Sequence, residues 1–277
     1  MIIIALVLSA CDLPHRSGTP VPEHPAPQSA AAPERPEPAG ESAPETLRIQ
    51  VPAGFTTARI GMLLEALDVS TAEEFIQAAQ TIDLADFPLI AAQVSGPNRF
   101  FLLEGYLFPG EYEIYPDESP ESIIRRMLAR TERNLGEGLR CAIAECPFTA
   151  DEIMIIASII QRESLGNDAY KPLVSSVIHN RLNTGMMLQM CKTSFYVRDY
   201  IAPFYGGDAA RFHAYYNTYL FHGLPAGPIC NPGLSAIHAA LLPADTDYFF
   251  YIWDSENVLH FAATWEEHVA NVLKHLY

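Results

Sequence analysis

The segment from residue 151 to about residue 164 constrains the fold most, because apolar side chains cover almost its whole circumference. Thr149 and Glu152 have the spacing of a capping box, which predicts the start of a helix, and Gly166 is placed to end it. A helix that is apolar on nearly every side has to be buried. We therefore expect it to form the core of its domain, through the following residues: Ile153, Met154, Ile155, Ile156, Ala157, Ile159 and Ile160.

One carboxylate lies on this apolar helix. Glu163 shares a face with Ile156 and Ile160, since residues three and seven positions apart lie on one side of a helix. Burial raises the pKa of a carboxyl group, and the negative end of the helix dipole acts in the same direction. Both effects favour the protonated state that a general acid needs. The alternative is a glutamate that bends into solvent or pairs with Arg162.

The composition excludes several classes of function. The chain has 277 residues, of which 33 are acidic and 17 are Lys or Arg, giving a formal net charge of −16. Since no basic run is present, we expect no nucleic acid among its partners. Five cysteines are too few for a fold built on disulfides. No C-x-x-C pair or H-E-x-x-H helix offers a metal site, so we expect neither a metal nor a cofactor.

The first 46 residues predict an export signal and a tether. Residues 1–11 form a short apolar run, and its end, Leu8-Ser-Ala-Cys11, resembles a bacterial lipobox, which implies a lipid on Cys11. An ordinary signal peptide or a membrane anchor is the alternative. Residues 12–46 contain nine prolines and hardly an aliphatic residue, a composition typical of a disordered, extended linker. We expect the rest of the chain to be held at the cell membrane, on its extracytoplasmic side.

Two folded units are predicted after the linker, and the fold class is α+β. Residues 47–146 predict a small unit with the order strand, helix, helix, strand, helix. Its strands are expected at 47–51 and 110–115, and its helices after Thr56 or Thr57, at Ser70 with Glu73 as a capping box, and at Pro120. Gly136, Gly138 and Pro147 predict a boundary. Residues 147–277 then form a second α+β domain around the apolar helix.

Several short motifs occur in one order across residues 103–268. The segment Ala157-Ser-Ile-Ile-Gln-Arg-Glu-Ser164 follows the pattern A-S-I-V-E-K-E-T. The others are Leu103-Glu-Gly-Tyr-Leu-Phe-Pro109, Asn180-Arg-Leu182 with Gly185-Met186 and Leu188-Gln189, Tyr216-Asn-Thr-Tyr219, the segment 223–233, the segment 243–248, and His260-Phe261 with His268. Together they resemble the YceG-like (MltG) family of endolytic transglycosylases of bacterial peptidoglycan.

The resemblance implies an inner-membrane enzyme that cuts glycan strands internally, between MurNAc and GlcNAc. It also implies that the first unit is LysM-like and that Glu163 corresponds to the catalytic glutamate of the family. Two departures stand out. Gln161 replaces the first glutamate of E-K-E, and Cys191 stands where the family pattern Q-S/T-D-P-T has its aspartate.

The implied reaction needs a single acid. Protonated Glu163 gives its proton to the bridging oxygen, and the carboxylate then takes the proton of the C6 hydroxyl, which leaves a 1,6-anhydro-MurNAc end. We expect the substrate-binding residues to be Glu104, Gln189, Asn217, Tyr219 and Asn231. For Glu104 and the three amides a structural role is an equal alternative, and for Tyr219 a buried structural tyrosine is the commoner case. We interpret His260 and His268 as structural, and a disulfide between Cys191 and Cys230 is compatible with an exported protein.

Two other functions stay open. A peptidoglycan-binding lipoprotein without turnover would account for the departures at Gln161, Cys191 and Lys192. A glycan hydrolase would use Glu163 together with Glu104, and would produce reducing ends instead of anhydro ends. The expected partners are peptidoglycan strands, the membrane and peptidoglycan synthases.

Overall fold

The structure, a computed structural model, describes residues 46–277 apart from 95, 97 and 206–208. The predicted signal peptide, the lipidation site at Cys11 and nearly all of the linker lie outside the described residues. Within the described part of the chain, none of the helices combines the length and the hydrophobicity needed to cross a bilayer. The fold is α+β, as predicted.

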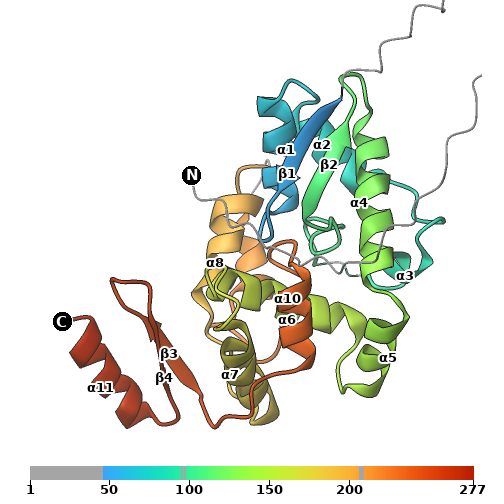
Figure 1. Ribbon diagram of the computed structural model, residues 1–277. Coiled ribbons are helices and arrows are strands. Elements are labelled where there is room, and N and C mark those ends of the chain that lie inside the picture. Colours follow the sequence, from blue (N-terminus) through green and yellow to red (C-terminus); the bar gives the residue numbers. More distant parts are fainter. Residues whose placement is uncertain (1–45, 95, 97, 206–208) are drawn as a thin grey trace, which may run out of the picture. The chain divides into compact units, whose positions relative to one another are not determined.

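The first unit is built on two antiparallel strands, β1 (Leu47–Val51) and β2 (Gly110–Ile114), which confirm both predicted strands. Buried and exposed residues alternate along each strand, so that one face packs against helices. Helices α1 (Thr57–Ala66), α2 (Ala72–Thr81) and α4 (Pro120–Asn134) lie beside this sheet, and the short α3 (Pro88–Ala91) contacts α4 (Figure 1). Thr56 caps α1, and Ser119 caps α4, whose first residue is the predicted Pro120.

One prediction about a helix start was wrong. The capping box of α2 is formed by Thr71 and Glu74, not by Ser70 and Glu73. Both pairs have the spacing of a capping box, so the pattern alone did not separate them. Near the boundary predicted from Gly136, Gly138 and Pro147, the chain forms a helix that was not predicted, α5 (Glu137–Glu145), with Gly136 as its N-cap.

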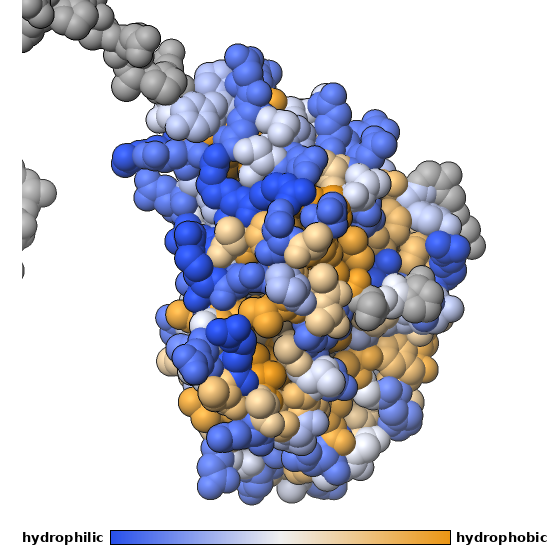
Figure 2. Space-filling model, turned by 90° about the vertical axis from the view of Figure 1, so that its right-hand side faces the viewer, coloured by the Kyte–Doolittle hydropathy of each residue, from blue (hydrophilic) through white to orange (hydrophobic). Residues whose placement is uncertain are grey.

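Helix α5 lies on the outside of the molecule and has no buried residue. Figure 2 views the side on which α4 and α5 lie in Figure 1, and shows hydrophilic residues above a broad hydrophobic area. Leu139 and Ile143 of α5 nevertheless pack against the hydrophobic core. The helix therefore covers part of the apolar helix that follows it.

The predicted apolar helix is α6 (Ala150–Glu163), and it is the core of the second half. Thr149 and Glu152 form its capping box as expected, and all residues from Ile153 to Gln161 are buried. Helix α6 packs against α7 (Lys171–Asn183) and α10 (Leu234–Leu241). Its last residue is Glu163, and the chain then turns through Leu165 and Gly166, both with positive φ.

The rest of the second half surrounds the end of α6. Helix α8 (Cys191–Tyr196) continues into a π-helical turn, η1 (Val197–Ile201), and a 3₁₀ turn, η2 (Ala209–Phe212), leads into α9 (His213–Tyr216). The antiparallel strands β3 (Phe250–Trp253) and β4 (Leu259–Ala262) form a second small sheet. Helix α11 (Trp265–His275) packs on this sheet.

The two predicted units are joined by direct contacts. The backbone N–H of Gly54 donates to the carbonyl of Asn231, and the N–H of Asn231 donates to the carbonyl of Phe55. Buried residues of both halves belong to one hydrophobic cluster. The division between residues 47–146 and 147–277 stays a sequence prediction, and so does the LysM-like character of the first unit.

Candidate active site

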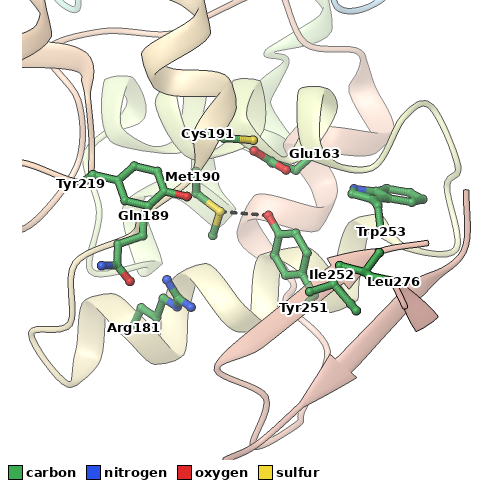
Figure 3. A pocket seen from close by; sticks show the side chains of 10 residues that line it. All are labelled: Glu163, Arg181, Gln189, Met190, Cys191, Tyr219, Tyr251, Ile252, Trp253 and Leu276. Atoms are coloured by element: carbon green, nitrogen blue, oxygen red, sulfur yellow. Dashed lines mark hydrogen bonds between the residues drawn. The ribbon is translucent and has the colours of Figure 1, made fainter. Parts of the chain in front are cut away.

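Glu163 lines a cavity of about 280 Å³ that is formed by the second half of the chain (Figure 3). Five parts of the chain form its walls: the end of α6, helix α7, the segment before α8, the loop after α9, and β3 with the C-terminal residues. The lining residues are Glu163, Arg181, Gln189, Met190, Cys191, Tyr219, Tyr251, Ile252, Trp253 and Leu276. Among these residues Glu163 is the only carboxylate.

The surroundings of Glu163 raise the pKa of its carboxyl and so favour the protonated form. Its side chain lies on the buried apolar helix, and the residue is only 2% exposed. Burial raises its pKa, and the opposing influence of the Lys192 ammonium, the Tyr251 hydroxyl and Arg162 is smaller. The N–H of Lys192 donates to Oε1 in a long hydrogen bond of 3.4 Å, and the hydroxyl of Tyr251 is a second hydrogen-bond partner of the carboxyl. A carboxyl with a raised pKa beside a cavity can act as a general acid.

Gln189 reaches the same cavity from a strained backbone position. Its φ is +51°, in the left-handed region that residues other than glycine seldom adopt. Two hydrogen bonds fix this turn, because the N–H of Gln189 donates to the carbonyl of Thr218 and the N–H of Met190 donates to its hydroxyl. The side-chain amide lies beside the cavity in Figure 3 and has no hydrogen bond among the described residues. It is available to a ligand.

Two neighbours of Gln189 complete this wall. Tyr219 is 48% exposed at the cavity, and the side chain of Asn217 accepts a hydrogen bond from the N–H of Tyr219 at 3.1 Å. Arg181 is buried, and its guanidinium donates to the carbonyls of Phe249 and Leu188. Arg181 therefore ties the segment before Gln189 to the start of β3.

Glu104 is buried elsewhere, in a network of hydrogen bonds. Its Oε1 accepts from the N–H of Thr57 at 3.0 Å and from Nδ2 of Asn231 at 3.2 Å, and its Oε2 accepts from the hydroxyl of Tyr196 at 2.9 Å. Burial raises the pKa of this carboxyl to about 7, and these hydrogen bonds oppose the rise. Asn231 also accepts from the N–H of Leu107. Neither Glu104 nor Asn231 lines the Glu163 cavity.

Two of the predicted motifs meet at this network. Gly105 has a φ of +92°, and a Cβ at this position would lie 2.5 Å from the ring of Pro228. The motif around residue 105 and the motif around residue 228 are thus packed against each other, and Glu104 and Asn231 are bonded at the same place. The structure brings Glu163, Gln189 and Tyr219 together at one cavity, and places Glu104, Asn217 and Asn231 outside its lining.

The suggested bridge between Cys191 and Cys230 is absent, because all four cysteines in the described residues are free. Cys191 lines the cavity, whereas the buried thiol of Cys230 faces away from it and donates to the carbonyl of Ser158 in α6. Cys141 and Cys146 are free as well. Burial raises the pKa of Cys191, so that its thiol stays protonated at neutral pH.

One group in the described part of the chain has donor atoms close enough to hold a metal ion: Asp254, His260 and His275. Nε2 of His260 lies 2.8 Å from a carboxylate oxygen of Asp254, and the His260 ring stacks on the His275 ring with an interplanar angle of 16°. Stacked rings direct their nitrogen lone pairs in nearly parallel planes, not at one point. We interpret the group as a link between the second sheet and the end of α11. His268 stacks on Phe250.

Several residues of the cavity were missed from the sequence. Arg181 lies within the motif Asn180-Arg-Leu182 but carried no predicted role. Tyr251 and Trp253 belong to a strand between two motifs, and no spacing connects them with Glu163.

The chain matches the YceG-like protein family over residues 37–274. An endolytic murein transglycosylase of Streptococcus pneumoniae is 28% identical over 246 residues, which are 82% of this chain and 44% of that protein. The endolytic murein transglycosylase of Bacillus subtilis is 34% identical over 185 residues, which are 66% of this chain and 51% of that protein. The chain thus spans about half the length of the curated relatives it matches.

A solved structure has the same fold. The crystal structure of a YceG-like protein from Listeria monocytogenes superimposes with a TM-score of 0.66 at 26% sequence identity, and covers 81% of this chain and 75% of that one. The motifs that suggested the resemblance lie within the matched segment. The chain belongs to the YceG-like family.

Proposed function

We propose that the protein is an endolytic lytic transglycosylase, which cleaves the glycosidic bond between MurNAc and GlcNAc within peptidoglycan strands. The observation that carries this proposal is the solitary buried carboxyl of Glu163 at a cavity with no second carboxylate. A hydrolase uses two carboxylates that flank the scissile bond. The named relatives, which are endolytic murein transglycosylases, support the same reaction.

Glu163 acts first as an acid and then as a base. The protonated carboxyl gives its proton to the bridging oxygen, the bond from C1 of MurNAc to this oxygen breaks, and positive charge develops at C1. The resulting carboxylate takes the proton of the C6 hydroxyl of the same sugar. O6 then bonds to C1, which closes the 1,6-anhydro ring and returns Glu163 to its protonated form. No water is consumed.

The residues around Glu163 hold the sugar. The free amide of Gln189 donates to and accepts from sugar hydroxyl or N-acetyl groups, and the exposed ring of Tyr219 stacks on a sugar face. Asn217 positions Tyr219 through its hydrogen bond to the backbone. Glu104 and Asn231, which the sequence suggested as substrate ligands, instead hold together the two motifs behind the site.

We also propose that the enzyme works outside the cytoplasm, next to the membrane. The lipobox-like segment at Cys11 and the proline-rich residues 12–46 support a catalytic unit that is anchored through a tether. Such an anchor would bring the site to newly made strands and close to the peptidoglycan synthases.

The test is mass spectrometry of peptidoglycan digested by the purified full chain, beside a Glu163→Gln variant. We expect anhydro-MurNAc ends with the unmodified protein only. Reducing ends would instead identify a two-carboxylate hydrolase. Binding to the sacculus without cleavage would identify the non-catalytic lipoprotein.

A further inference from the structure

A second cavity, of about 320 Å³, lies directly behind Glu163. Two chain segments separate it from the first cavity. In each segment, one residue lines the first cavity and the residue next to it in the chain lines the second. In α6, Glu163 lines the first cavity and Arg162 lines the second; at the start of α8, Cys191 lines the first and Lys192 the second. The backbone N–H of Lys192 donates to Glu163 across this wall. The two cavities are therefore neighbours that share a wall built from these two pairs of consecutive residues.

The second cavity is cationic, in a chain with a net charge of −16. Arg59, Arg162 and Lys192 line it, and no carboxylate does. None of the three forms an ion pair within the described residues. Gln161, which stands where the family pattern has a glutamate, lines the same cavity, so the departure from the pattern removes a negative charge from this place.

The three cations are held by contacts that do not neutralise them. The guanidinium of Arg59 lies 4.0 Å from the centre of the Phe55 ring, and that of Arg162 donates to the carbonyl of Gly54. The ammonium of Lys192 lies 5.8 Å from the centre of the Phe195 ring. Such contacts orient a cation and leave N–H groups free for an anion.

We propose that this cavity binds the carboxylates of the stem peptide, so that the enzyme recognises peptide-bearing MurNAc. The inference rests on the proposed function, in which a MurNAc residue occupies the cavity at Glu163. The stem peptide branches from the lactyl group of that sugar and carries free carboxylates, and guanidinium groups bind carboxylates in paired hydrogen bonds. In a peptide-bearing strand the lactyl carboxyl is bound in the amide bond to the peptide, so the glycan itself carries no charge that would require three cations.

The first experiment measures binding apart from catalysis. A Glu163→Gln full chain is titrated with three probes: a GlcNAc–MurNAc disaccharide with its tetrapeptide, the same compound with its carboxylates converted to amides, and the disaccharide without peptide. We expect the first to bind about tenfold more tightly than the other two, as for a hydrogen bond between charged groups. Equal dissociation constants for all three would overturn the proposal.

Arg59 provides the variant, because it lies in the second cavity and does not contact Glu163. Arg59→Gln should remove the roughly tenfold preference for the charged peptide, and Arg59→Lys should keep part of it. The matched control is Arg211→Gln. Arg211 also stacks on aromatic rings, at 4.8 Å from Tyr205 and 4.7 Å from Phe212, but lies outside this cavity. An unchanged preference in Arg59→Gln would contradict the assignment.

The second experiment compares cleavage by the unmodified chain on peptide-bearing strands and on strands stripped of peptide by an amidase. The proposal predicts a lower KM for the peptide-bearing strands, and no such difference with Arg59→Gln. If no strand is cleaved but the charged peptide still binds preferentially, the proposed reaction is wrong and the peptide site stands. If both kinds of strand are cleaved with equal KM, the reaction stands and the peptide site is wrong.

Discussion

Glu104 and Glu163 are both buried glutamates with a raised pKa, and they lie in two very different regions of the same molecule. Glu104 is surrounded by donors from Thr57, Tyr196 and Asn231, which belong to distant parts of the chain. Glu163 accepts a long hydrogen bond from the N–H of Lys192, has the Tyr251 hydroxyl as its other partner, and faces a cavity of about 280 Å³.

The difference shows that a raised pKa alone does not tell whether a buried carboxyl has a structural role or can act on a ligand. Burial raises the pKa of both carboxyls, but the donors around Glu104 occupy its oxygens, and Glu104 is not among the residues that line the Glu163 cavity. Its hydrogen bonds join separate parts of the fold. Glu163 has fewer hydrogen-bond partners and lines a cavity, so it can give its proton to a ligand. Access to a cavity and the number of hydrogen bonds distinguish Glu163 from Glu104. The following predictions test this distinction.

The largest expected effect is on turnover. Glu163→Gln should lower the cleavage rate by about 10³-fold, within the range for loss of a general acid and base, and should leave the melting temperature almost unchanged. Digestion of peptidoglycan followed by mass spectrometry, together with calorimetry, measures both quantities. Glu104→Gln is the matched control and should keep measurable turnover. A Glu163→Gln variant with more than a tenth of the original rate would remove Glu163 from the mechanism.

The next effect is on stability. Glu104→Ala leaves buried donors of Thr57, Tyr196 and Asn231 without their acceptor, which should lower the free energy of unfolding by about 3 kcal/mol. Glu163→Ala, which loses a long hydrogen bond from the N–H of Lys192 and the hydrogen bond with the Tyr251 hydroxyl, should cost less, about 1 kcal/mol. Urea titrations of the two variants measure the difference. Equal losses would mean that the two environments do not differ as described.

The pH dependence of stability gives a third test. The pKa of Glu104 rises from 4.5 to about 7 on folding, so the folded protein holds this proton more tightly than the unfolded chain. The resulting contribution to stability is complete below pH 4.5 and is lost as the pH rises through about 7, which amounts to about 3 kcal/mol. Unfolding curves at pH 4.5, 6 and 8 should therefore be less pH-dependent in Glu104→Gln. An identical slope would show that Glu104 titrates normally.

The smallest effect concerns the pH profile of activity. Because the acid must be protonated, kcat/KM should fall as the pH rises through the raised pKa of Glu163. The hydroxyl of Tyr251 lowers this pKa, so Tyr251→Phe should move the alkaline limb to higher pH. Tyr219→Phe, at the opposite wall, serves as the control. A shift to lower pH would reverse the inferred influence of Tyr251.

The buried position of Glu163 could be predicted from the sequence because it depends on local patterns. A capping box at Thr149, a run of apolar residues and the spacing to Glu163 together specify a buried helix with one carboxyl at its end. Helix α5 could not be predicted in this way, because a glycine such as Gly136 can either interrupt a helix or serve as its N-cap.

The role of Glu104 could not be predicted in the same way. Its partner Asn231 is 127 residues away in the chain, and its environment exists only once the two halves are packed together. The same holds for Tyr251, which reaches the cavity from a separate small sheet. Nothing in the local sequence distinguishes either residue from an ordinary core residue.

The capped start of α6 has a consequence for how such a chain can evolve. The helix runs from Ala150 to Glu163, and each residue turns it by about 100°, so one inserted or deleted residue would carry the terminal carboxyl out of its cavity. Aliphatic residues along α6 can replace one another as long as volume is kept. The number of residues between the capping Thr149 and Glu163, by contrast, has to stay constant, because it sets the direction in which the carboxyl points. Alignments of functional relatives should therefore be free of gaps between these two positions, and insertions should collect in the loops that follow.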